Sequence, residues 1–263
     1  MRNNRTFSIE PQVAQARVIL ERHLGPSIVA IHLFGSAVDG GLQPYSDIDL
    51  LVTVDKPPGA TVRHELMREL LTASAPPGVS TSLRALEVTV LVLANIVPWH
   101  YPARREVQFG EWLREDILAG VFEAPTIDHD LAILIAKARA HSTAIIGPAA
   151  HILFHPIPRA DLERALLDTV AQWSKPEDWT GDERNIVLAL ARGWYTAVTG
   201  DITSKDAAAT WLMEKIAPRH QPVLSRARAS YLGQEQDSLS NYPADVAGFI
   251  AYARRSIEQI CSA

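Results

Sequence analysis

The sequence predicts an α/β domain with a mixed sheet, followed by an all-α helical bundle. In the first half, Val- and Leu-rich runs of strand length alternate with stretches of helical periodicity. Beyond the proline-rich segment 155–158, every apolar pattern has helical spacing. Such a change from mixed to purely helical patterning indicates two domains. We predict them at residues 1–157 and 158–263.

The first half opens with a predicted helix over residues 9–24, where Val13, Ala16, Ile19 and Leu20 recur at helical spacing. Clusters of proline and glycine separate the elements that follow. Further helices are predicted at 61–73, 113–119 and 127–141, with another helical segment from Gly147, and strands at 27–34, 47–54, 84–93 and 105–112.

The second half is predicted to be helical throughout. The helix at 181–199 is apolar nearly all round, which is typical of a buried helix. Thr180 and Glu183 have the spacing of a capping box at its start. The full set of predicted helices is 159–173, 181–199, 205–216, 219–232 and 242–260.

A polar stripe runs along the helix at 181–199. Asp182, Asn185, Arg192 and Thr196 fall within roughly one quarter of its circumference. One interpretation is an exposed stripe whose charges never meet. The other is a helix that lines a cleft between the two domains, with Asp182 facing a cationic substrate and Arg192 facing a phosphate.

The start of the next helix offers a second phosphate contact. Ser204 is predicted to be its N-cap. Lys205 then adds a positive charge to the positive end of the helix dipole, which is unfavourable for stability but suits an anion. The alternative interpretation is a solvated surface lysine.

The stretch 33–51 carries the most informative motif. Because side chains alternate faces along a strand, Asp47 and Asp49 present two carboxylates to one spot. Adjacent acids repel unless a cation lies between them, and oxygen ligands suit Mg²⁺. Gly35 lets the backbone approach closely, and Ser36 opens a short helix whose N–H groups can hold a phosphate.

A third acid, Glu87, lies in the otherwise apolar strand 84–93. A lone carboxylate in a buried strand costs several kcal/mol unless it is paired or binds a metal. Glu87 is therefore either an acid at a solvated strand end or a third carboxylate beside Asp47 and Asp49.

Composition limits the classes of protein. Apolar residues make up 47% of the chain, the net charge is −5, and no basic run is longer than two residues. A nucleic-acid binder usually has a basic face, so this charge favours a cationic small molecule. The single cysteine, Cys261, excludes an intramolecular disulfide and a cysteine zinc site. Neither a secretory signal nor a membrane-spanning run is visible, which predicts a cytoplasmic protein.

Gly35-Ser36 is followed by ten residues and then by Asp47-Ile48-Asp49, and this motif lies between two apolar runs. The pattern resembles the signature of the nucleotidyltransferase superfamily. Other segments extend the match: GSAVDGGLQPYSDIDLLVTV, RALEVTV, VPWHYPARREVQFGEWLREDI, GDERNIVLALARGWYTAVTG and SKDAAATWL. Together, and over nearly the whole chain, they resemble the aminoglycoside (3'')(9) adenylyltransferases, which are streptomycin and spectinomycin resistance enzymes.

The resemblance implies an N-terminal nucleotidyltransferase domain and a C-terminal helical domain, with ATP and the antibiotic bound between them. The implied reaction transfers AMP from ATP to a hydroxyl of the antibiotic and releases pyrophosphate. The implied cofactor is Mg²⁺, as two ions. Neither nucleic acid nor a membrane is an expected partner, and a monomer is the working hypothesis.

The resemblance also implies roles for individual residues. Asp47, Asp49 and Glu87 hold magnesium, and Glu87 is the catalytic base. The positions that match ATP contacts are Ser36, Ser46, Arg192, Lys205 and Tyr231. The positions that match antibiotic contacts are Trp112 and Asp182 for both drugs, Trp173 and Asp178 for streptomycin, and Asn185, where some relatives have histidine.

Two alternatives belong to other classes. One is a nucleotidyltransferase that acts on another small molecule or on RNA; the lack of a basic face argues against RNA. The other is a non-catalytic nucleotide-binding module, against which the presence of all three carboxylates argues.

Overall fold

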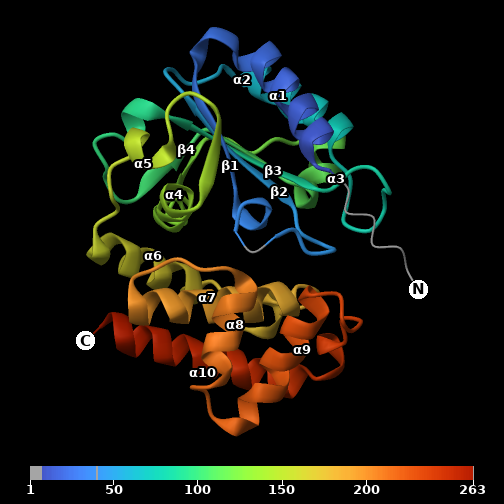
Figure 1. Cartoon of the computed structure of the whole chain (residues 1–263), viewed down its shortest axis with the longest axis vertical. Coiled ribbons are helices and arrows are strands. Elements are labelled where there is room, and N and C mark those ends of the chain that lie inside the picture. Colours follow the sequence, from blue (N-terminus) through green and yellow to red (C-terminus); the bar gives the residue numbers. More distant parts are fainter. Residues whose placement is uncertain (1–7, 40, 263) are drawn as a thin grey trace.

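The computed structural model describes residues 8–39 and 41–262. Figure 1 shows a twisted sheet with helices on both faces, and below it a bundle of helices. The predicted fold class, a mixed α/β half followed by an all-α half, is confirmed. None of the helices in the described part of the chain is long and apolar enough to cross a membrane.

The main sheet has the strand order β5-β3-β2-β1-β7. β2 and β3 are parallel, whereas the other neighbouring pairs are antiparallel, so the sheet is mixed as predicted. The strands are β1 (Ile28–Phe34), β2 (Ile48–Val54), β3 (Leu86–Val92), β5 (Val107–Phe109) and β7 (Ser142–Ile146), while β4 (Ala103–Arg105) pairs with β6 (Thr126–Asp128) in a separate ribbon.

Alternation along β2 assigns its side chains to the two faces of the sheet. Ile48 and Leu50 are buried in a core with residues of α1 (Glu10–Leu24) and α2 (Ala60–Leu70). Leu51 is buried in a second core with α4 (Leu131–Ala140) and α5 (Ala150–Leu153). Asp49 has the parity of Leu51, so its carboxylate belongs to the α4 face of the sheet.

The second half has one core, built from all of its helices. α7 is buried along most of its length, with Ile186, Val187 and Leu190 among the buried residues, which confirms the prediction of a buried helix. The helices of this half are α6 (Arg159–Ala171), α7 (Glu183–Thr199), α8 (Lys205–Met213), α9 (Gln221–Tyr231) and α10 (Pro243–Cys261).

One face of α6 joins the two halves through hydrogen bonds. Three residues of α6 and its C-cap Gln172 form hydrogen bonds to the first half, and helical periodicity brings these positions to a common side. The pairs are Trp99 Nε1 to Asp161 (3.0 Å), Tyr101 hydroxyl to Asp168 (2.6 Å), Thr169 hydroxyl to Asp130 (2.5 Å) and Gln172 with His129 (2.9 Å). These bonds hold α6 against the sheet half. Figure 1 shows α6 at the top of the helical half, directly below the sheet half.

Four predicted elements of the first half are wrong in part. The strand at 105–112 is two short strands, β4 and β5, and the helix at 127–141 begins only at Leu131, after β6. Residues 142–146, for which no element was predicted, form the edge strand β7. The helical segment expected from Gly147 begins at Ala150, and the helix expected at 113–119 is the single turn α3 (Arg114–Leu118).

Candidate functional site

Three acids lie at one end of the parallel strands β2 and β3. Asp49 and Glu87 are register partners in this pair, and Asp47 precedes β2 with the same parity as Asp49. Gly35 closes over Asp49 with φ of 74°, and a Cβ atom added there would lie 1.7 Å from Asp49 Oδ2. Only glycine therefore allows the loop after β1 to approach the carboxylate.

Two of the acids, Asp47 and Glu87, have raised proton affinity. Burial and then the charge of Asp49 raise the pKa of Asp47 to about 6 and the pKa of Glu87 to about 7. Gln108 Nε2 donates a hydrogen bond of 3.2 Å to Glu87 and orients it. Crowded carboxylates of this kind form a donor set for a hard cation. Within the described residues, however, no group of three His, Cys, Asp or Glu side chains is arranged to hold a metal ion.

Three cations face the same space. Arg192 comes from α7, Lys205 is the first residue of α8, and Lys137 comes from α4. Burial and then the charge of Arg192 lower the pKa of Lys205 to about 8. Burial also lowers the pKa of Arg192, whose Nε has no hydrogen-bond partner in the described structure. Buried charges without partners point to a ligand of the opposite sign.

Loop and helix ends complete this region. Ser204 caps α8 by accepting a hydrogen bond of 3.2 Å from the amide of Ala207, so the predicted N-cap is confirmed. Burial raises the pKa of the Tyr231 hydroxyl, and a hydrogen bond with Ser46 opposes this change. That bond links the loop before β2 to the end of α9, and thus the sheet half to the helical half.

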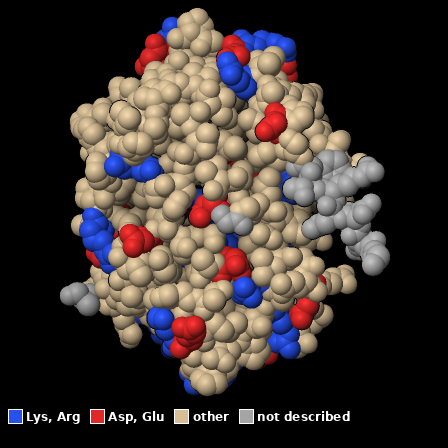
Figure 2. All heavy atoms as spheres, viewed as in Figure 1, with Lys and Arg blue, Asp and Glu red and all other residues tan. Residues whose placement is uncertain are grey.

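All of these groups line one cleft of about 480 Å³ between the two halves. A volume of this size is typical of sites for small molecules. Figure 2 shows acidic side chains in the middle of this face of the molecule, where the two halves meet. The predicted site residues that line the cleft are Ser36, Ser46, Asp47, Asp49, Glu87, Trp173, Asn185, Arg192, Lys205 and Tyr231.

Three predicted antibiotic contacts, Trp112, Asp178 and Asp182, are not among the residues that line the cleft. Trp112 is 60% exposed, and its indole lies against Gly110, where an added Cβ atom would be 2.2 Å from the ring. Asp182 is exposed and accepts a hydrogen bond of 2.6 Å from Asn185 Nδ2, so Asn185 connects it to the cleft.

Asp178 braces a turn. Its carboxylate accepts hydrogen bonds from the amides of Ser174 (2.8 Å) and Lys175 (3.0 Å), and these bonds lower its pKa. The predicted capping box at the start of α7 is wrong. The Thr180 hydroxyl bonds instead to the carbonyl of Pro176 at 2.8 Å, because Thr180 belongs to the preceding turn.

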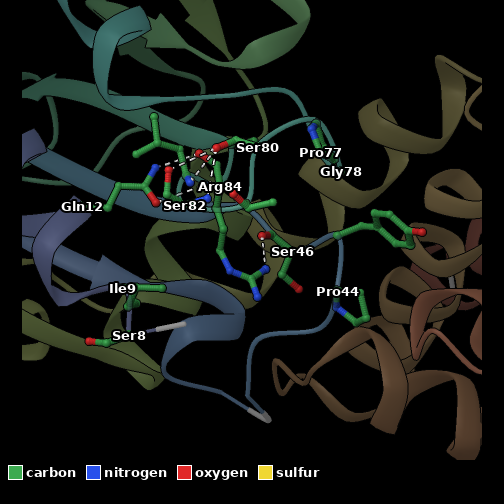
Figure 3. Close-up of a pocket in the computed structure, with 14 residues that line it drawn as sticks. Ser8, Ile9, Gln12, Pro44, Ser46, Pro77, Gly78, Ser80, Ser82 and Arg84 are labelled. Atoms are coloured by element: carbon green, nitrogen blue, oxygen red, sulfur yellow. Dashed lines mark hydrogen bonds between the residues drawn. The ribbon is translucent and has the colours of Figure 1, made fainter. Parts of the chain in front are cut away.

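A second cavity of about 200 Å³ lies behind the loop that carries Ser46 and Asp47 (Figure 3). Arg84 crosses it and donates hydrogen bonds from Nη1 to the carbonyls of Gln43 (2.9 Å) and Ser46 (3.1 Å). Gln12 fixes the backbone of Arg84 from the other side, accepting from its amide at 3.0 Å. Arg84 thus holds the loop in place and puts a positive charge near Asp47.

Sequence reasoning missed four charged residues that line the cleft: Asp39, Asp130, Lys137 and Arg184. Asp130 joins α6 through Thr169, and the Arg184 guanidinium lies 5.4 Å from the centroid of the Tyr45 ring. Lys137 is a single lysine in the apolar run LAILIA-K-A, and that contrast is the pattern that could have identified it.

Two protein-family models match the chain. The model for the nucleotidyltransferase domain matches residues 13–108, and the model for the C-terminal domain of aminoglycoside adenylyltransferase matches residues 152–256. The first range contains the three acids, and the second contains Arg192 and Lys205. The two models thus supply opposite sides of the cleft.

Named relatives match over nearly the full chain. An aminoglycoside (3'')(9) adenylyltransferase from Escherichia coli is 52% identical, with 99% of both chains covered. A spectinomycin 9-adenylyltransferase from Staphylococcus aureus is 40% identical, with 95% of both chains covered. The crystal structure of the spectinomycin adenyltransferase AAD(9) from Enterococcus faecialis, with ATP and spectinomycin, superposes with a TM-score of 0.88 at 30% identity, covering 95% of this chain and 99% of that one.

Proposed function

The chain belongs to the aminoglycoside (3'')(9) adenylyltransferase family, and we propose from this premise that it transfers AMP from ATP to the 3'' hydroxyl of streptomycin and the 9 hydroxyl of spectinomycin. Pyrophosphate is the other product, and the modification confers resistance on the host. The observation that carries this proposal is that three acids of the first half and two cations of the second half, Arg192 and Lys205, line one cleft. We also propose that the two domains divide at residue 157.

The acids serve the metal and the attacking hydroxyl. Asp47, Asp49 and Glu87 would hold magnesium, for which two ions are our working number. The described residues show no ready-made three-ligand cluster, so the bound ion would draw together the register partners Asp49 and Glu87 and the neighbouring Asp47. Bound magnesium would neutralise phosphate charge and lower the pKa of the attacking hydroxyl. Glu87 would accept the hydroxyl proton, since it is the register partner of Asp49, the acid beside which the metal-bound phosphate would lie.

The cations and hydroxyls serve the triphosphate. Arg192 and Lys205 would bind its oxygens and neutralise the charge that develops on the leaving pyrophosphate. Ser36 and Ser46 can donate hydrogen bonds from the loops around the acids, and Tyr231 can do so from α9. Because these groups come from both halves, the nucleotide would bridge the two domains.

The antibiotic would occupy the remaining part of the cleft and its rim. Trp173 and Asn185 line the cleft, and Asn185 orients the exposed carboxylate of Asp182. Trp112 and Asp178 would extend the site outward, the indole for stacking and the carboxylate for a cationic group on the drug. Exposed acids near the opening suit a polycationic substrate.

An assay of AMP transfer tests the proposal. The purified chain is incubated with magnesium and ATP labelled on the α-phosphate, together with streptomycin, spectinomycin or transfer RNA. We expect label on both drugs, none on the RNA, and no transfer by Glu87→Gln. Label on RNA alone would support the RNA-directed alternative. Nucleotide binding without transfer to any acceptor would support the non-catalytic alternative.

A further inference from the structure

Lys137 is a buried lysine to which the proposed function gives no role. It belongs to α4, whose residues Leu131, Ile135 and Ala138 pack into the core against the sheet. The Lys137 ammonium lies 5.1 Å from the centroid of the Phe34 ring. Phe34 directly precedes Gly35 and Ser36 in the chain. Lys137 therefore lies next to the loop that closes over the acids.

The parity of the strands brings the acids toward the same helix. Asp49 lies on the same face of the sheet as Leu51 of β2, and Glu87 lies on the same face as Leu91 of β3. Leu51 and Leu91 both belong to the core that α4 completes. Asp49 and Glu87 thus open toward the α4 side of the sheet, where Lys137 lines the cleft with them.

Lys137 nevertheless makes no ion pair with these acids. The ion pairs of the described residues, defined by N–O distances up to 4.0 Å, include none with Lys137, Arg192 or Lys205. Besides burial, the charge of Arg192 lowers the pKa of both lysines, and the charge of Lys137 lowers the pKa of Lys205, so these cations are close enough to repel. Three mutually repelling cations in a cleft shielded from water are stabilised by an anion with several charged oxygens.

We infer that the Lys137 ammonium binds a non-bridging oxygen of the nucleotide α-phosphate, on the acid side of the cleft and opposite Arg192 and Lys205. The inference rests on the proposed function. The Lys137 ammonium lies over the ring of Phe34, the residue before Gly35, and Lys137 shares the α4 face of the sheet with Glu87, the group assigned to the attacking hydroxyl. The phosphate under attack must lie beside that hydroxyl, so Lys137 and the α-phosphate come together.

The role of Lys137 in the transfer is electrostatic. The hydroxyl oxygen forms a bond to the α-phosphorus, and its proton goes to Glu87. The bond from the α-phosphorus to the bridging oxygen breaks, and pyrophosphate leaves with the electron pair. Lys137 stays protonated throughout and stabilises the charge on the non-bridging oxygens of the α-phosphate, which remain on the phosphorus as AMP passes to the drug.

The test measures nucleotide affinity in the absence of turnover. Calorimetry with the magnesium complex of α,β-methylene-ATP compares the wild type with Lys137→Met, Lys137→Arg and Lys215→Met. Lys215 is the matched control, since its ammonium also lies over an aromatic ring, 4.5 Å from that of Trp211, but on the exposed surface. Adenosine and spectinomycin are titrated as ligands that lack the phosphate.

We expect Lys137→Met to weaken binding of the analogue by about 10- to 100-fold, as for the loss of a charge-assisted hydrogen bond. Adenosine and spectinomycin should bind each variant as they bind the wild type, Lys137→Arg should recover part of the loss, and Lys215→Met should change nothing. Equal affinity of Lys137→Met and the wild type for the analogue would overturn the inference. So would an equal loss for adenosine, which would indicate a general disturbance of the cleft.

A measurement on the wild type covers the case in which Lys137→Met does not fold. The chain has five lysines, so after reductive methylation with carbon-13 each dimethylamine gives a resolvable signal. The analogue should shift the signals of Lys137 and Lys205 and leave those of Lys56, Lys175 and Lys215 in place. An unmoved Lys137 signal would overturn the inference. A wild type that binds the analogue through Lys137 but modifies neither drug would instead refute only the proposed function.

Discussion

Replacing Glu87 with glutamine should stabilise the metal-free protein and at the same time abolish AMP transfer. The Glu87 carboxylate is buried beside Asp49, and both effects raise its pKa from 4.5 to about 7. A raised pKa of an acid means that its charged form destabilises the folded state. The neutral amide removes that charge, and its oxygen can still accept the hydrogen bond from Gln108 Nε2.

The size of the effect follows from the pKa. The pKa difference between 4.5 and about 7 is about 2.5 units. At about 1.4 kcal/mol for each unit, the charged Glu87 lowers the free energy of unfolding by roughly 3 kcal/mol at pH 8.5. For a chain of this length, removing that penalty corresponds to a rise in Tm of roughly 6–12 °C. The wild type gains the same stability by taking up a proton as the pH falls from 8.5 through 7 toward 4.5. The advantage of Glu87→Gln should therefore shrink to roughly 1 kcal/mol by pH 5 and disappear only below about pH 4.

The assay is thermal unfolding in a chelating buffer, from pH 5 to pH 8.5. Glu106→Gln is the control, because Glu106 is also buried, at 3% exposure, but pairs with Arg104 at 3.0 Å. Loss of that pair should lower Tm at pH 8.5, the opposite sign to Glu87→Gln. A lower Tm for Glu87→Gln at pH 8.5, or a gain that is the same at pH 5, would refute the assignment of an electrostatic penalty to Glu87.

Three further predictions concern ligands. Magnesium affinity, measured by calorimetry without nucleotide, should fall as the pH is lowered from 8 to 6. Protons compete with the ion at Glu87 and then at Asp47, whose pKa values are raised to about 7 and about 6. An affinity that does not change with pH would assign the ion to other ligands. ATP should bind before the antibiotic or strongly increase its affinity, because the cleft is lined from both halves; tight streptomycin binding without nucleotide would contradict this. Asp178→Ala should lower resistance to streptomycin alone, whereas Asp182→Ala should lower resistance to both drugs. The inhibitory concentrations of both drugs are measured for each variant. If Asp178→Ala lowers both values equally, the role of Asp178 is only to stabilise its turn.

Elements with strong local patterns could be predicted from the sequence, and those that depend on tertiary pairing could not. The strands at 27–34, 47–54 and 84–93 are apolar runs of strand length, and each forms within two residues of its predicted bounds. β7 has no such pattern, since its residues are half-buried or exposed, and it pairs only with the edge of β1. Short edge strands of this kind are defined by the neighbour that they pair with.

The same distinction applies to the site. Asp49, Glu87 and Arg192 were identifiable because each interrupts a buried, apolar element, where a charge is costly without a purpose. Trp112 and Asp178 lie in exposed turns, and only the family resemblance pointed to them. Lys137 was overlooked because a lysine on a helix is usually solvated, and its burial depends on the packing of α4 against the second half.

The distribution of charge between the halves explains how the cleft can stay open. Arg192 and Lys205 belong to helices of the second half, whereas Asp49 and Glu87 belong to the sheet. Direct contact between the two sets would form buried ion pairs, which would fill the site. A cleft of about 480 Å³ lies between the two sets, and it leaves both of them without ion-pair partners. A simple anion would satisfy the cations and worsen the repulsion among the acids, and a simple cation would do the reverse. A nucleotide triphosphate with its divalent metal carries both signs in one ligand, and it is therefore the kind of ligand that this cleft selects.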